Sequence, residues 1–80
     1  MKITVETKFD VGDMVYVANH YHDWYAEHRL YIVRDITINI RKSIPYIQYE
    51  VELDGLVSTA SERMLFKTYE ECVEWCAKNK

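Results

Sequence analysis

Apolar and polar residues alternate along much of the chain, which is the pattern of half-buried β-strands. The alternation is strictest over 47–53, where every second residue is apolar and the residues between are Gln or Glu. The Asp54-Gly55 dipeptide that follows is typical of a two-residue hairpin turn. The sequence therefore predicts a strand over 47–53 that turns back into a second strand over 56–59.

The segment over 29–41 carries the longest strand signal. Apolar residues occupy both alternating sets of positions before Arg34-Asp35 and only one set after it. This change predicts a bulge or sharp bend at Arg34-Asp35, which lets one long strand serve two halves of a barrel. A turn is predicted at Lys-Ser-Ile-Pro, residues 42–45.

The N-terminal third is less regular. The Ile-Thr-Val segment at 3–5 predicts a short strand, and 9–13 predicts a turn in which Gly12 takes a positive φ. The β-forming run over 14–18 predicts the next strand. From 19 to 27 the pattern fits neither a strand nor a helix, so we expect a loop with room for one helical turn.

A helix is predicted near the C-terminal end. Residues 61–66 fit one helical turn followed by a last short strand. The Thr-Tyr-Glu-Glu segment at 68–71 is a capping box, because Thr68 can accept a hydrogen bond from the third helical N–H while Glu71 reaches back to the Thr68 N–H. The apolar stripe of this helix is Tyr69, Cys72, Val73 and Cys76.

Together these elements predict a single, mainly β (α+β) domain over residues 1–80. Its expected architecture is a small, strongly bent antiparallel barrel or half-barrel of about five strands, with one C-terminal helix. The predicted core consists of Val15, Val17, Leu30, Ile32, Val33, Ile36, Ile38, Tyr49, Val51, Leu53, Leu65, Phe66, Cys72 and Val73.

Composition and charge narrow the function classes. Hydrophobic residues make up 49% and charged residues 29% of the chain, as in folded globular proteins. The formal net charge of −3 disfavours nucleic acid as the main partner, because phosphate-binding surfaces are usually basic. The apolar runs are too short to span a bilayer and no charged-then-apolar leader begins the chain. We therefore expect cytoplasmic residence, no membrane partner, and reduced thiols at Cys72 and Cys76.

A family pattern covers most of the chain. It consists of Phe9-x-Val11-Gly12-Asp13-x-Val15-Tyr16, a strand pair, and Met64-Leu65-Phe66 followed by Thr68-x-Glu70-Glu71. In this pattern the chain resembles small uncharacterised SH3-like barrel proteins of bacteria and their phages. The resemblance implies an SH3-like barrel and a binding or accessory role, with no catalytic residues to transfer. The chain departs from it at 19–28, where an aromatic insertion takes the place of a tight first hairpin.

Three aromatic residues lie in this insertion, at 21, 24 and 25. Exposed Trp and Tyr side chains on a rigid scaffold serve as anchors at protein interfaces, because they bury much area with few rotamers to immobilise. The alternatives are that these aromatics cover an open end of the barrel as core, or that one points inward and two outward. The predicted partner-binding residues are Tyr21, His22, Asp23, Trp24, Tyr25 and Arg29.

Other chemistries are less well supported. A zinc site could be drawn from His20 and His22 with Cys72 and Cys76, but none of the specific zinc spacings is present. Neither cysteine is predicted at a helix N-terminus or beside a cation that lowers its pKa. A glycine-rich phosphate loop is excluded because the chain has only two glycines. We therefore predict no enzyme activity, no metal and no cofactor.

The leading hypothesis is a non-enzymatic protein-binding module. The resemblance extends it to a phage or mobile-element accessory protein that binds and inhibits a host defence protein. The first alternative is single-stranded nucleic-acid binding, with the aromatics stacking on bases beside Arg29, Arg34, Arg41 and Lys42. The second is a small-ligand or metal binding protein. A homodimer through open strand edges is also compatible with a small barrel.

Overall fold

The computed structural model describes residues 5–79, and the chain forms one antiparallel sheet followed by a helix. The sheet has six strands in the order β2-β1-β3-β4-β5, with β6 pairing to β1. The elements are β1 (Met14–Tyr21), β2 (Asp23–Ala26), β3 (Tyr31–Arg41), β4 (Ile44–Leu53), β5 (Leu56–Ser61), the 3-10 turn η1 (Glu62–Met64), β6 (Leu65–Phe66) and α1 (Tyr69–Lys78).

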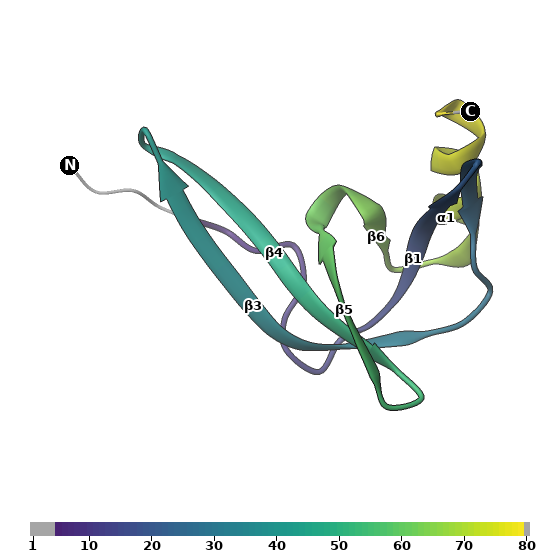
Figure 1. Ribbon diagram of the computed structural model, residues 1–80, viewed down its shortest axis with the longest axis horizontal. Helices are drawn as coiled ribbons and strands as arrows, with labels where there is room; N and C mark the ends of the chain where they lie inside the picture. Colours follow the sequence, from purple (N-terminus) through teal and green to yellow (C-terminus); the bar gives the residue numbers. More distant parts are fainter. Residues whose placement is uncertain (1–4, 80) are drawn as a thin grey trace.

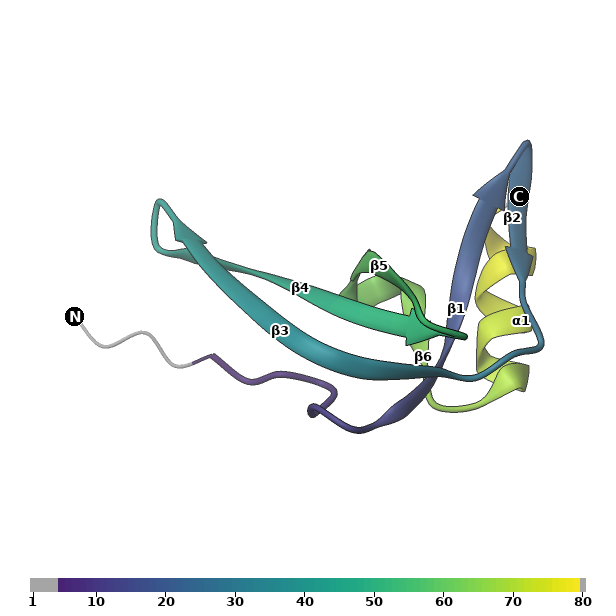
Figure 2. The same cartoon turned by 60° about the horizontal axis from the view of Figure 1, so that its bottom comes forward.

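The mainly β fold with a C-terminal helix is confirmed. The prediction left open a barrel or a half-barrel, and the described strands form a sheet that does not close into a barrel. The strands β3 and β4 make a long hairpin that extends away from the rest of the molecule (Figure 1). The hairpin of β1 and β2 stands across it, and α1 packs against that hairpin (Figure 2). The sheet is therefore strongly bent but open.

The bulge predicted at Arg34-Asp35 is confirmed, because the β3–β4 register shifts between Val33 and Asp35. Val33 faces the core before the bulge and Ile36 packs against the core after it. The extra residue exchanges the inward and outward positions of the strand. The prediction of Leu30 and Ile32 as core residues was therefore wrong, and both side chains are exposed.

The core is divided between the sheet and the helix. Under the bent sheet lie Phe9, Val15, Val17, Val33, Tyr49, Val51, Ala60 and Leu65. A second cluster lies between the sheet and α1 and consists of Ala18 and Phe66 from the sheet with Cys72 and Cys76 from the helix. Ile38 was wrongly predicted as core, because it lies beyond the sheet core on the extended part of the β3–β4 hairpin and is exposed. Val73 is also exposed, since α1 turns Trp75 rather than Val73 toward the β1–β2 hairpin.

The predicted turns agree with the structure at most positions. Asp54 and Gly55 have φ values of 51° and 83°, and Gly12 has a φ of 98°. The turn predicted over 42–45 is shorter than expected, since only Lys42 and Ser43 form it and Ile44 already belongs to β4.

Further predictions concern the first strand and the segment that leads into the helix. Val5 is not in a strand, and Ile3 lies outside the described residues. The predicted helical turn and short strand over 61–66 are present as η1 and β6. The Thr68 hydroxyl oxygen accepts a hydrogen bond from the Glu71 N–H at 3.2 Å, which confirms the predicted start of α1.

The loop predicted over 19–27 is wrong. β1 continues to Tyr21 and β2 begins at Asp23, so the segment forms a tight hairpin. The apex residue His22 takes a φ of 65°, which is uncommon for a residue other than Gly. Because His is not a strong turn signal, the alternation of strand residues on either side of it was not apparent from the sequence.

Candidate protein-binding face

The β1–β2 hairpin places its side chains on two different faces. Asn19 pairs with Tyr25 and Tyr21 pairs with Asp23, so these four residues share one face. The pairs of His20 with Trp24 and of Ala18 with Ala26 lie on the opposite face, because successive residues of a strand point to opposite sides.

The helix covers the face that carries Trp24. The indole rings of Trp24 and Trp75 meet edge to face, with centroids 4.9 Å apart, and the His20 ring contacts Trp24 at the same centroid distance. Ala18 is fully buried in this cluster with Cys72. Trp24 is thus half-buried and joins the hairpin to α1, so its side chain is not on the exposed face with the two tyrosines.

The face turned away from α1 remains open. Tyr21 is 74% exposed and Tyr25 is 47% exposed. Asp23 lies opposite Tyr21 and two residues before Tyr25 on the same face, and it is also exposed. We call Tyr21, Asp23 and Tyr25 the tyrosine face. The His22 ring packs on the Tyr21 ring with centroids 4.5 Å apart at the tip of the same hairpin. The outcome of one aromatic inward and two outward, which the sequence left open, is the one observed.

A hydrogen-bonded group supports the base of the tyrosine face. Glu27 accepts hydrogen bonds from the Asn19 amide at 2.7 Å and from the Tyr31 hydroxyl at 2.8 Å. Burial, and then the hydrogen bond to Glu27, raise the pKa of Tyr31 above its ordinary value, so the phenol stays a donor at neutral pH. These three residues were missed by sequence reasoning, because Asn19, Glu27 and Tyr31 converge only once the hairpin is folded.

The basic residues that the nucleic-acid alternative uses lie in two separate parts of the molecule. Arg29 forms an ion pair with Asp54 and lies 3.7 Å from Glu27, and Arg34 contacts Glu52 at 2.6 Å. Arg29 thus connects the β2–β3 segment to the β4–β5 turn, and it belongs to the rim of the tyrosine face only through Glu27. Arg41 and Lys42 lie at the distant tip of the β3–β4 hairpin. The basic side chains along β3 therefore do not form one continuous strip of the kind that binds nucleic acid, because Arg34 is paired with Glu52.

The cysteines and histidines do not converge. Within residues 5–79, no group of three or more His, Cys, Asp or Glu side chains is arranged to hold a metal ion. Burial, with the neighbouring Cys76, raises the pKa of Cys72 to about 12. The Cys72 thiol is therefore protonated at neutral pH and is a poor nucleophile. His28 instead stacks on Tyr69, with ring centroids 4.1 Å apart.

Comparison with known proteins does not add a functional assignment. No protein-family model, curated protein or solved structure matches the chain. None of the helices in the described part of the chain has the length and apolar character needed to cross a membrane.

Proposed function

We propose that this protein is a non-enzymatic binding module that docks a protein partner on the tyrosine face. The observation that supports this most directly is the pair Tyr21 and Tyr25, which stay exposed on one face of a hairpin that α1 holds from behind. Exposed tyrosines on a well-packed support bind with little loss of conformational freedom, because few side-chain torsions have to be immobilised.

The charge of this surface defines the kind of partner. Asp23 is exposed and has no ion pair among the residues that the structure describes. The chain as a whole carries a formal charge of −3. A partner surface with an apolar centre and a basic rim complements the tyrosine face, because opposite potentials favour the encounter and discriminate against acidic proteins.

The fold class is part of the same proposal. The strands β3, β4 and β5 form a meander, and η1 leads from β5 into β6, which pairs with β1. This connectivity supports placing the chain among SH3-like folds with an open sheet. The setting that the family resemblance implies, a phage or mobile-element protein that inhibits a host defence protein, stays a prediction. It rests on that resemblance, on the small size of the chain and on its acidity.

Capture of partners from a bacterial lysate tests the proposal. The tagged wild type is compared with the double variant Tyr21→Ala/Tyr25→Ala, and Tyr46→Ala serves as the matched control because Tyr46 is 52% exposed on a different hairpin. Nuclease is added to each lysate. We expect a stoichiometric protein that is retained by Tyr46→Ala and lost with the double variant.

Binding of the captured protein is then measured by calorimetry. Removing two anchor tyrosines should cost about 2–4 kcal/mol, which corresponds to a weakening of roughly 30-fold to 1,000-fold. Equal affinity of the double variant and the wild type contradicts the proposal. Recovery of nuclease-sensitive material whose binding falls steeply with salt supports the nucleic-acid alternative instead.

A further inference from the structure

The outer half of β3, residues 36–41, has an open edge. Toward its start, β3 pairs with β1 at Tyr31 and Ile32, and Val33 exchanges backbone hydrogen bonds with Gly12 and Asp13 at 2.8 and 2.9 Å. Beyond the bulge, no strand in the described residues pairs with this side of β3, whose other side is occupied by β4. The edge is therefore a row of backbone donors and acceptors open to another strand.

The register identifies the residues whose backbone groups face this edge. A hairpin with a two-residue turn has a hydrogen-bonded pair next to the turn, and here that pair is Arg41 with Ile44. From there, successive pairs alternate between non-hydrogen-bonded and hydrogen-bonded. Ile36, Ile38 and Ile40 then direct their N–H and C=O groups away from β4.

Two independent observations agree with this assignment. Pro45 lies opposite Ile40 and has no N–H. If Ile40 directs its backbone groups away from β4, the residue opposite it donates no hydrogen bond to β3, so Pro is tolerated there. The Ile36 N–H donates to the Asp35 carboxylate at 2.9 Å rather than to β4.

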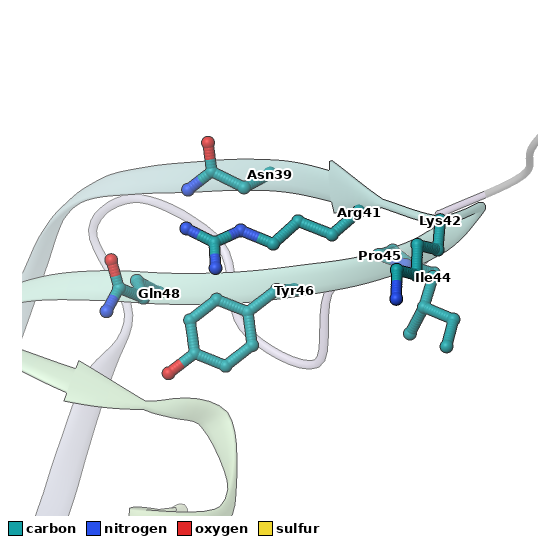
Figure 3. A pocket seen from close by; sticks show the side chains of 7 residues that line it. All are labelled: Asn39, Arg41, Lys42, Ile44, Pro45, Tyr46 and Gln48. Carbon is teal, nitrogen blue, oxygen red and sulfur yellow. The ribbon is translucent and has the colours of Figure 1, made fainter.

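The two ends of this part of β3 carry charges of opposite sign. Asp35 lies opposite Glu50 in the β3–β4 register, and such a like-charged pair is unfavourable. Arg41 and Lys42 stand at the other end of the same strand, and Arg41 lies along the polar face between Asn39 and Tyr46 (Figure 3). Among the described residues, none of these four charged side chains has an ion pair. A cation from another molecule could thus pair with the acids at the Asp35 end, and an acid could pair with the cations at the Arg41 end.

We propose that the outer half of β3 pairs antiparallel with the same segment of a second copy of this chain, about a two-fold axis at Ile38. Ile38 then faces Ile38 of the other copy, Ile36 faces Ile40, and the N–H and C=O groups of these residues form the new ladder. The Ile36 N–H exchanges its bond to the Asp35 carboxylate for one to the Ile40 carbonyl of the other copy, which leaves the carboxylate available to a cation. In this register Asp35 of each copy lies opposite Arg41 of the other. Of the antiparallel registers, only this one brings the two charges together.

The side chains are suited to such an interface. Ile38 is 44% exposed and Ile40 is 51% exposed, on the face that continues the sheet core. Pairing places these branched side chains beside their equivalents, which is a favourable cross-strand combination. The central residues 36–40 contain no Pro, Gly or Lys to discourage pairing, whereas Pro45 protects the corresponding edge of β4.

A closed two-fold pair also prevents indefinite edge-to-edge growth. Figures 1 and 2 place the tip of the β3–β4 hairpin and the β1–β2 hairpin at opposite ends of the molecule, so self-association leaves the tyrosine face free.

Analytical ultracentrifugation of the full chain over a range of concentrations tests this proposal. Arg41→Asp places an acid opposite Asp35 of the other copy and should raise the dimer dissociation constant at least about tenfold. The exchange variant Asp35→Arg/Arg41→Asp should restore the wild-type constant to within about threefold. Within one chain these positions are six residues apart on one strand, roughly 20 Å, so this rescue can arise only between chains.

Lys67→Asp is the matched control, because it makes the same charge change at an exposed residue outside β3 and should leave the dissociation constant unchanged. Far-UV circular dichroism verifies that each variant is folded. A wild type that remains monomeric into the millimolar range overturns the proposal. A dimer that the exchange variant fails to restore overturns the register.

Discussion

Replacing Trp24 by Ala should affect the stability of the fold much more than replacing the exposed Tyr21. Trp24 is half-buried between the β1–β2 hairpin and α1, and its ring meets Trp75 edge to face at 4.9 Å. A fully buried Trp→Ala change costs about 3–5 kcal/mol. Because Trp24 remains partly exposed, we expect a loss of about 2–3 kcal/mol in the free energy of unfolding, a large part of what a domain of this size has.

The aromatic contact itself can be isolated in a double-mutant cycle. Trp24→Ala, Trp75→Ala and the combined variant should give a coupling free energy of about 0.5–1.5 kcal/mol, the usual value for an edge-to-face pair. The assay is urea unfolding followed by far-UV circular dichroism, because the variants lose the tryptophan fluorescence that is otherwise convenient. The control variant Tyr21→Ala should change the unfolding free energy by no more than about 0.5 kcal/mol.

Two outcomes would refute this reasoning. A Trp24→Ala variant as stable as Tyr21→Ala shows that α1 does not support the hairpin through Trp24. A coupling near zero shows that the two indoles act independently. The first result also removes Trp24 from the support of the tyrosine face and leaves only the packing of Ala18 and Ala26 against α1.

Two further variants test the hydrogen bonds of the core and of the helix start. Burial and the hydrogen bond to Glu62 raise the pKa of Tyr49 to about 12, from an ordinary value of 10.0. Its contribution to stability is therefore complete below about pH 10 and is lost as the pH rises toward 12, so the unfolding free energy of Tyr49→Phe should fall less over that interval than that of the wild type. Cys72 titrates in the same range, and its contribution is the same in both proteins. Thr68→Ala removes the hydroxyl that accepts from the Glu71 N–H and should lower the unfolding free energy by about 1 kcal/mol in urea unfolding, and an unchanged midpoint contradicts the cap.

The sequence correctly predicted the structural features that depend only on residues close together in the chain. The Asp54-Gly55 turn, the bulge at Arg34-Asp35 and the start of α1 at Thr68 are all present. Each depends on backbone preferences or on a hydrogen bond between neighbours in the chain, so the sequence alone is sufficient to specify it. The alternation over 47–53 likewise identified Tyr49 and Val51 as core residues.

The face that each side chain occupies was less predictable where it depends on a distant element. Leu30 and Ile32 are exposed because the confirmed bulge exchanges the two sides of β3, and the sequence did not say which side of the strand meets the core. Ile38 has the alternation of a core residue, but the sheet that would cover it ends before reaching it.

Sequence reasoning identified the aromatic residues of the candidate face, but it did not predict on which side of the hairpin each of them lies. The segment 19–27 looked irregular because its turn is made by His22 and the strand that follows, β2, has only four residues. Tyr21, Trp24 and Tyr25 were all identified, yet whether each is an anchor or a core residue depends on where α1 packs. The helix begins 44 residues after the Trp24–Tyr25 pair ends, at Tyr69, and a pattern within one segment carries no information about which distant surface will cover it. The amino-acid sequence thus determined the strands, turns and helix of this protein, while tertiary packing decided which of its aromatic side chains remain exposed.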